Sequence, residues 1–359
     1  MKMLKNILKL TAIWMAATVS FTACEVDTTT VMFEEDHDFS QPGDTVFSML
    51  GILDKVQDVV EKGVLLGELR GDLVKPDPFV GTSSAWVDLT RFENLENATF
   101  NRYRDYYAIV NNCNFYLERA DAEMERRGQK VFLKEYAAVS AYRAWAYLQL
   151  ALLYGEVPFY TQPLLSYSEI EQVMNDPSKR KGLGEICSYF IDDLLPYVDV
   201  PFPNYGNFTY DQSSSVNSSD FFLPIRLLRG DLYLWRGSLD GNKSDFAKAA
   251  QEYRDYLLSE KRFVSPDVKV AYRTVDMDGA QIVDRWSSVF LGNNYNESIS
   301  LVPFAGNSQY GKLGSLRQSF RSFMGSDALQ KLVDESYYCY VMYTEESESG
   351  ESEYMSRFT

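Results

Sequence analysis

The chain has 359 residues, of which 45% are hydrophobic and 24% charged, a composition typical of globular proteins and unlike that of disordered chains or polytopic membrane proteins. Its 51 acidic and 35 basic residues give a net charge of −16, which argues against nucleic-acid binding because phosphates are bound by basic surfaces. The single histidine, His37, excludes a multi-histidine zinc centre and argues against Ser-His-Asp catalysis. We find no glycine-rich phosphate loop, and we expect no cofactor, no metal and no nucleic-acid partner.

The first 24 residues resemble the signal peptide of a bacterial lipoprotein. Lysines precede an apolar run from Leu10 to Val19, which is too short to span a bilayer. The run is followed by Phe21-Thr22-Ala23-Cys24, in which small residues lead to a cysteine as in a lipobox. The pattern predicts cleavage of residues 1–23 and lipidation of Cys24, which would hold the mature chain on a membrane. An ordinary secretory signal, with a cysteine at this place by chance, is the alternative.

Composition divides the rest of the chain into three parts. Residues 24–45 are polar and acidic and predict a tether between the lipid and the folded body. Residues 46–343 carry apolar periodicity and predict a helical domain. Residues 344–359 include the run Glu345–Glu353, with five acids and no base, and predict a disordered tail.

Apolar residues spaced three or four apart predict helices in the first half of the body, with Gly and Pro near their ends. The expected elements are a helix over 46–69 that ends near Gly63, a long loop over 70–97, a helix over 99–127, and a helix from Val131 to Tyr154 that ends at Gly155. The last two helices predict an antiparallel hairpin of tetratricopeptide type. The second of them contains small residues that allow close helix packing, including Ala141.

Several side chains of this hairpin and the helix after it are expected in the core. Tyr142, Trp145 and Tyr147 recur at helical spacing and are core residues by default. Cys113 and Cys187 lie in apolar helical patterns and predict buried free thiols.

The second half of the body predicts further helices and then an irregular region. Helices are expected over 184–196, 220–236 and 245–260, with a loop over 199–219, a short strand from Ile299 to Phe304 and a last helix over 327–343. The pair 220–236 and 245–260 forms a second hairpin. We therefore expect a mainly α fold of tetratricopeptide-like helix hairpins, with long irregular loops and little β structure.

Aromatic residues in predicted loops are candidate ligand contacts, because a loop has little core to fill and aromatic rings stack on the C–H faces of sugars. We place the ligand between the stretches 70–97 and 264–310. The candidate ligand-binding residues are Trp86, Trp286, Tyr295 and Tyr310 for stacking, with Asp72 and Asn293 as hydrogen-bond partners. Packing of these rings beneath the loops is the alternative.

Other motifs leave different roles open. Asp240-Gly-Asn242-Lys-Ser244 begins like a calcium loop, but Asp245 and Gln251 stand where an EF-hand has Gly and Glu, so we expect a helix-capping turn. The pair Asp192-Asp193 keeps a surface glycoside hydrolase as an alternative, since that chemistry needs two carboxyl groups. Arg70-Gly71-Asp72 keeps a structural or adhesive role as another.

The segment from Glu135 to Pro158 resembles the signature of the SusD/RagB family, an Ala-rich helix with Arg143, closed by Tyr154-Gly155-Glu-Val-Pro158. Other segments resemble the helices around that signature, and these are residues 106–114, 220–263 and 297–299. The resemblance covers roughly residues 1–325. The Arg- and Ala-Glu-Ala-rich segment found late in the family has no counterpart here.

The resemblance implies both a location and a function. It implies a lipoprotein anchored through Cys24 at the surface of the outer membrane of Bacteroidetes. Such a protein binds oligosaccharides or other nutrients and caps a TonB-dependent outer-membrane transporter of SusC type. It has no catalysis of its own.

Overall fold

The computed structural model describes residues 42–71, 74–76, 84–94, 102–209, 215–259, 273–275, 282–284, 300–302, 304, 312–314 and 323–325. Cys24 and the expected signal peptide, most of the expected tether, the helix expected over 327–343 and the expected tail lie outside these residues. Within the described ranges, no helix combines the length and the apolar character that crossing a membrane requires.

The described chain is mainly helical, which confirms the predicted fold class. Its α-helices are α2 (Pro42–Glu68), α3 (Ser84–Arg91), α4 (Tyr103–Arg119), α5 (Leu133–Tyr154), α6 (Tyr167–Asn175), α7 (Leu183–Asp193), α8 (Ile225–Asp240) and α9 (Lys243–Ser259). The strands are short and pair antiparallel: β1 (Val74–Pro76) with β10 (Phe323–Gly325), β2 (Glu125–Arg126) with β3 (Gln129–Lys130), β4 (Val157–Pro158) with β5 (Arg180–Lys181), β6 (Asn207–Thr209) with β7 (Ser215–Asn217), and β8 (Arg273–Val275) with β9 (Ile282–Asp284).

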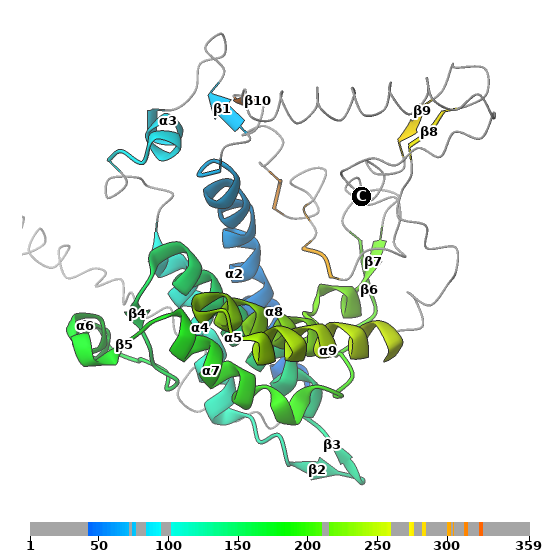
Figure 1. The fold of residues 1–359 in the computed structure, drawn as a ribbon. Coiled ribbons are helices and arrows are strands. Elements are labelled where there is room, and N and C mark those ends of the chain that lie inside the picture. The colour runs from blue at the N-terminus through cyan, green and yellow to red at the C-terminus, as the bar shows by residue number, and fades with distance from the viewer. Residues whose placement is uncertain are drawn as a thin grey trace, which may run out of the picture.

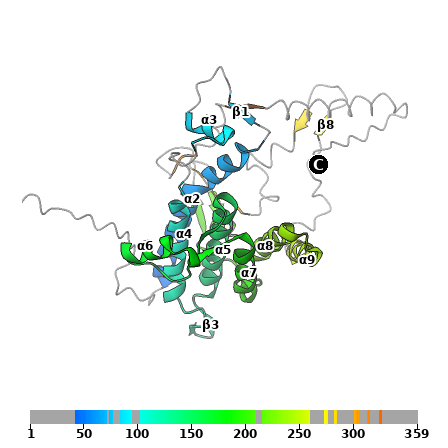
Figure 2. The same ribbon diagram turned by 60° about the vertical axis from the view of Figure 1, so that its left-hand side comes forward.

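The helices form antiparallel pairs that follow one another in space. α4 packs against α5, α8 packs against α9, and α7 contacts both α5 and α8. Figures 1 and 2 show this succession from α4 to α9, and they show α2 running past the bundle toward α3 and β1. This is the predicted arrangement of tetratricopeptide-like hairpins.

α5 is the central helix and is buried on several sides. Its Ala141 and Ala144 are fully buried, and the small side chains let neighbouring helices approach closely. Tyr142 and Tyr147 are 1% and 0% exposed, which confirms that they are core residues. The helix ends at Gly155, whose φ of 79° suits a residue without a Cβ, so the predicted C-terminus is also confirmed.

Cys113 of α4 and Cys187 of α7 are free thiols with no exposed surface, as predicted. Burial raises the pKa of each thiol to about 12, so both remain protonated at neutral pH and are poor nucleophiles. Their role is packing.

The segment 157–165 follows α5 in extended form and is held largely by side chains of α4. Tyr107, Asn111 and Asn114 share one face of α4, because they are spaced by four and three residues. The Tyr107 hydroxyl donates to the carbonyl oxygen of Pro158 at 2.6 Å. Asn111 Nδ2 donates to the carbonyl oxygen of Leu164 at 2.9 Å, and Asn111 Oδ1 accepts from the N–H of Leu164 at 2.8 Å.

Asn114 extends this polar face into the core. Its Nδ2 lies 3.3 and 3.2 Å from the carbonyl oxygens of Tyr160 and Gln162. Its Oδ1 accepts from Nη1 of Arg143 at 3.2 Å, and Nη2 of Arg143 lies 3.1 Å from the carboxylate of Asp193. The buried amide of Asn114 therefore links α4 to the extended segment and to Arg143 of α5. Arg143 in turn links this group to the end of α7.

The first helix is longer than predicted at its start and is not interrupted at Gly63. It begins at Pro42, so residues 42–45 of the expected tether are helical, and it continues through Gly63 to Glu68. A Cβ at Gly63 would lie 3.1 Å from the Tyr106 hydroxyl oxygen. The glycine serves the close approach of α2 to α4 rather than the end of a helix.

The helix expected over 99–127 is shorter than predicted and ends at Arg119. After it the chain turns into the hairpin of β2 and β3, where Arg127 and Gly128 have φ values of 54° and 73°. Two consecutive residues with positive φ form a tight turn and cannot continue an α-helix.

The remaining differences between the predicted and the observed structure concern short helices and strands. The expected loop over 70–97 contains β1 and α3, and the expected loop over 199–219 contains β6 and β7. α6 has no counterpart among the predictions, although Ser166 and Glu169 form a capping box at its start. Residues 300–302 and 304 of the expected strand are not in a strand; instead the N–H of Leu301 donates to the carbonyl oxygen of Asp220 at 2.8 Å.

We predict that Ala141→Leu lowers the free energy of unfolding by about 1–3 kcal/mol, because a larger side chain overpacks a closely packed contact. Ala141 is 0% exposed. The measurement is urea denaturation, with Ala250→Leu at an exposed position of α9 as the matched control. Equal unfolding midpoints for the two variants would contradict the close packing of α5.

We predict that Glu135→Gln stabilises the protein at neutral pH. Burial raises the pKa of Glu135, whose Oε1 lies 3.3 Å from the Tyr205 hydroxyl. A carboxyl group with a raised folded-state pKa stabilises the fold below its unfolded-state pKa, and that contribution is lost as the pH rises through the folded-state pKa. The variant should therefore exceed wild type in unfolding free energy at pH 7 but not at about pH 4. Exposed Glu118→Gln, measured by the same pH series, should show no such difference; the reverse sign for Glu135→Gln would refute the prediction.

Candidate functional site

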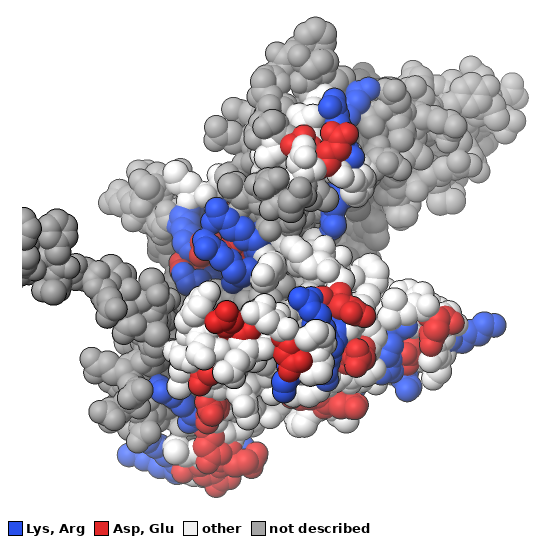
Figure 3. Space-filling view, turned by 90° about the vertical axis from the view of Figure 1, so that its left-hand side faces the viewer, with Lys and Arg blue, Asp and Glu red and all other residues white. Residues whose placement is uncertain are grey.

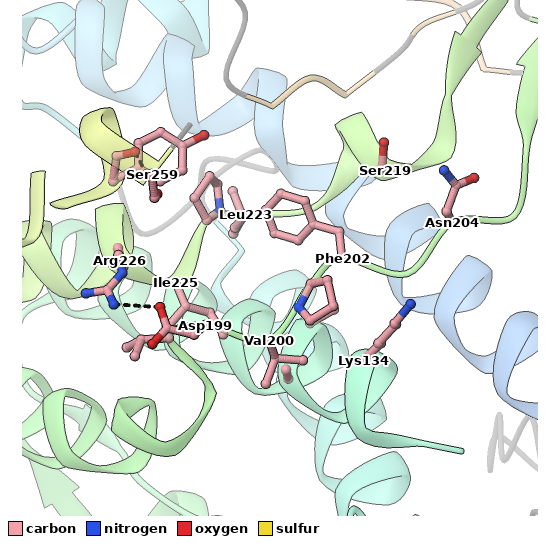
Figure 4. A pocket seen from close by; sticks show the side chains of 16 residues that line it. Lys134, Asp199, Val200, Phe202, Asn204, Ser219, Leu223, Ile225, Arg226 and Ser259 are labelled. Carbon is pink, nitrogen blue, oxygen red and sulfur yellow. Dashed lines mark hydrogen bonds and ion pairs between the residues drawn. The ribbon is translucent and has the colours of Figure 1, made fainter. Parts of the chain in front are cut away.

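A cavity of about 460 Å³ lies between α5, the loop over residues 198–204 and the helix pair α8 and α9 (Figure 4). Its size falls in the range of small-molecule binding sites, roughly 300–1,000 Å³. Much of its wall is apolar. The apolar side chains include Val200, Phe202, Leu223, Ile225 and Tyr256, and two of these are aromatic.

Polar side chains stand at both ends of this cavity, with the apolar wall between them. Figure 4 shows Lys134, Asn204 and Ser219 on one side and Asp199, Arg226 and Ser259 on the other. The cavity could therefore hold a ligand with an apolar face in its middle and hydrogen-bonding groups at its two ends.

The two cations of the cavity differ in their surroundings. Nη2 of Arg226 lies 2.6 Å from Asp199 and its Nη1 lies 3.3 Å from Glu252. The hydrogen bond to Asp199 raises the pKa of Arg226 above its ordinary value, so this guanidinium is charged and already compensated. Lys134 is exposed and makes no ion pair with any described residue. At one end of the cavity the charge of Arg226 is balanced by nearby carboxylates, whereas at the other end the charge of Lys134 is not balanced by an ion pair with any described residue.

The groups that line this cavity can hold a ligand through apolar and hydrogen-bonding contacts. Asp199 is the one acidic residue among them and is engaged by Arg226, whereas glycoside hydrolysis needs two carboxyl groups facing each other across the sugar. Ser219 and Ser259 line the cavity with no histidine among the other lining residues. The wall offers apolar surface for a ring and hydroxyl, amide and ammonium groups for its substituents.

The structure describes Trp86 among the candidate ligand-binding residues predicted from the sequence. Asp72, Trp286, Asn293, Tyr295 and Tyr310 lie outside the described residues. Trp86 lies on α3 rather than in a loop and is half-buried. It packs against a small apolar cluster separate from the main core, made of Leu65, Leu66, Leu69, Leu89 and Phe323.

Segments far apart in the sequence meet at α2, α3 and β1. Val74 of β1 pairs with Gly325 of β10, and Phe323 joins the cluster beneath α3. Lys312 Nζ lies 2.6 Å from Asp54 and 2.7 Å from Asp58 on α2. The stretch 70–97, the first of the two predicted to hold the ligand, therefore lies beside residues that follow the second stretch, 264–310.

The other motifs have structural roles in the described chain. Gly241 caps α8 with a φ of 70°, and Asn242 Oδ1 accepts from the N–H of Ser244 at 3.0 Å, which confirms a capping turn. Asp193, one of the two acids that keep the hydrolase alternative, pairs through its carboxylate with the buried Arg143 at 3.1 Å. No group of three His, Cys, Asp or Glu residues in the described part could hold a metal ion.

None of the residues that line the cavity is among the ligand-binding residues predicted from the sequence. Phe202 lies in the sequence Pro201-Phe202-Pro203-Asn204, within a stretch that was predicted as a loop. The criterion that selected Trp86, an aromatic residue in a loop, would also have selected Phe202. Lys134 and Tyr256 lie on helices, and only the packing of α5 against the later hairpin shows that they share a cavity.

No known family model matches the sequence, and no curated protein is significantly similar to it. Solved structures do resemble the fold. A SusD superfamily protein from Bacteroides thetaiotaomicron superposes with a TM-score of 0.52 at 12% identity, over 82% of this chain and 62% of that one. NanU from B. fragilis superposes with a TM-score of 0.51 at 17% identity, over 76% of this chain and 49% of that one.

At such low identity the likeness concerns the fold alone. The chain spans 62% and 49% of the lengths of these two structures, so it is clearly shorter than either. The chain has a SusD-like fold, built on the helix hairpins from α4 to α9.

Proposed function

We propose that this chain is a cell-surface lipoprotein that binds a glycan or another nutrient and delivers it to a SusC-type TonB-dependent outer-membrane transporter, without catalysis of its own. The observation that carries the proposal is the SusD-like arrangement of the helix hairpins. The lipobox-like sequence that ends at Cys24 supports anchoring at the outer membrane, which is where a nutrient-capturing protein meets its ligand.

The cavity beside α5 supports ligand binding by the described part of the chain. An aromatic and aliphatic wall accepts the apolar face of a sugar ring, and the polar groups at both ends can bond to hydroxyl groups. Trp86 and Trp286 remain the stacking candidates of a second site, between the two stretches proposed from the sequence.

We predict that Phe202→Ala weakens glycan binding by about 2- to 10-fold, the range expected when one stacked ring is lost. Affinity electrophoresis against a panel of neutral and acidic polysaccharides measures this, and the matched control is Phe246→Ala, a ring on α9 outside the cavity. Trp86→Ala and Trp286→Ala in the same assay test the second site.

The possible outcomes of this assay distinguish the cavity from the site near α3, and a binding protein from a glycoside hydrolase. Weakening by Phe202→Ala alone assigns the ligand to the cavity, and weakening by the Trp variants alone assigns it to the stretches near α3. If every correctly folded variant binds like wild type, neither site is correct. Release of reducing ends from a bound glycan would favour the hydrolase alternative, and no binding to any glycan would refute the glycan proposal.

We predict that Cys24→Ala abolishes lipidation, because the lipobox cysteine is the residue that carries the lipid. Metabolic labelling with a radioactive fatty acid measures this. Cys113→Ala, which removes a buried thiol, should keep the full label. Undiminished label on the Cys24 variant would disprove the proposed anchor.

A further inference from the structure

A group of four basic side chains gathers where the C-terminal half of α2 meets the first turn of α4. Lys62 Nζ lies 2.9 Å from Oδ2 of Asp105, and Nε of Arg104 lies 3.6 Å from Oδ1 of the same carboxylate. Arg102 directly precedes α4, and Arg70 follows α2. We call Lys62, Arg70, Arg102 and Arg104 the basic patch.

The basic patch is positive in a chain that is strongly negative overall. Lys62 and Arg104 both pair with the carboxylate of Asp105, and Arg70 and Arg102 lie on the adjoining ends of α2 and α4, whereas the whole chain carries −16. Figure 3 shows one side of the molecule, on which a compact group of Lys and Arg side chains surrounds a small acidic centre. A local positive charge of this kind attracts anionic ligands to one place on an otherwise repelling surface.

Much of this charge is available to a ligand. Arg104 is 73% exposed and Lys62 38% exposed, and Arg102 is exposed and makes no ion pair with a described residue. Arg70 donates its Nε to the carbonyl oxygen of Leu66 at 2.6 Å, which holds the guanidinium in place and leaves its other N–H groups for a ligand. Guanidinium groups bind carboxylates and sulfates through paired hydrogen bonds.

Two tyrosines border the basic patch. The Tyr154 hydroxyl is buried and has no hydrogen-bond partner among the described residues, which is unfavourable for a buried polar group. Burial raises the pKa of Tyr154 to about 12, and the charges of Asp105 and Arg70 both act on it, so this hydroxyl lies close to the patch. Tyr103 is 51% exposed, and its ring packs edge-on against that of Tyr154 at 6.0 Å.

We propose that the basic patch binds the carboxylate or sulfate groups of an acidic polysaccharide, with the exposed ring of Tyr103 against a sugar face. This inference rests on the proposed function and narrows its ligand from glycans in general to acidic ones. The combination of cations with an exposed aromatic ring fits an acidic sugar better than a small inorganic anion, because a sugar offers both a charged group and an apolar face.

The test compares acidic polysaccharides with uncharged counterparts on the full chain. The probes are polygalacturonate, alginate and chondroitin sulfate, together with carboxyl-reduced polygalacturonate, which keeps the backbone but not the charge. We expect wild type to bind at least one acidic probe, with an affinity that falls as salt is added, since exposed charge pairs are screened. Binding to neutral glycans of the earlier panel but to none of the acidic probes overturns the inference and leaves the proposed function intact.

The variant Arg102→Gln/Arg104→Gln tests the location. We expect it to weaken binding of the acidic probe about tenfold at low salt, because it removes two charge-assisted contacts. The control Lys243→Gln/Arg254→Gln removes the same charge from exposed positions of α9 and should change affinity less than about twofold, since distant exposed charges are screened. Circular dichroism verifies that both variants fold.

Two further results, one from the variants and one from the probes, would overturn the inference. Equal weakening by both double variants would mean that net charge, not the patch, governs binding. Equal affinity for polygalacturonate and its carboxyl-reduced form would mean that no acidic group is recognised. If the protein binds no glycan at all, the proposed function fails and the inference fails with it.

Discussion

The hydrogen bonds of Asn114 fix the relation of the first helix pair to the extended segment after it and, through Arg143, to α7. Its amide donates to two carbonyl oxygens of the extended segment after α5 and accepts from Arg143, which in turn pairs with Asp193 at the end of α7. Breaking these bonds would leave the buried amide and the buried guanidinium without these partners, so the segments they join have little freedom to shift. The α4–α5 pair and α7 are thereby set in one arrangement.

The cavity is a consequence of that arrangement and of the close packing of the second pair. A Cβ at Gly230 of α8 would collide with the ring of Tyr253, so only glycine allows α9 to lie this near. With α9 at that distance, Tyr256 reaches the wall of the cavity opposite α5. Arg226 anchors the same end through Asp199 and Glu252. Helix packing supplies the apolar wall, and the chain between α7 and α8 supplies Phe202 and Asn204.

The cavity and the basic patch, the two proposed binding regions, would use different physical forces. The cavity has a largely apolar wall and suits the face of a sugar ring. The basic patch is exposed, and its positive charge is local within a chain of −16. An acidic polysaccharide, the ligand proposed for the basic patch, offers both the charged groups and the sugar faces that these two regions would contact.

Local sequence patterns determined which segments are helical in the hairpins. The periodicity of α5, α8 and α9, the end of α5 at Gly155 and the burial of Tyr142 and Cys113 depend on neighbouring residues and were predicted. Short elements such as α3, α6 and β1 were missed, because a few residues carry too little periodicity. The cavity, by contrast, could not be predicted from local patterns, because its walls come together only in the tertiary structure. Lys134 and Phe202 are 68 positions apart in the sequence, and only the packing of the helix pairs, a sum of long-range contacts, makes them neighbours of one cavity.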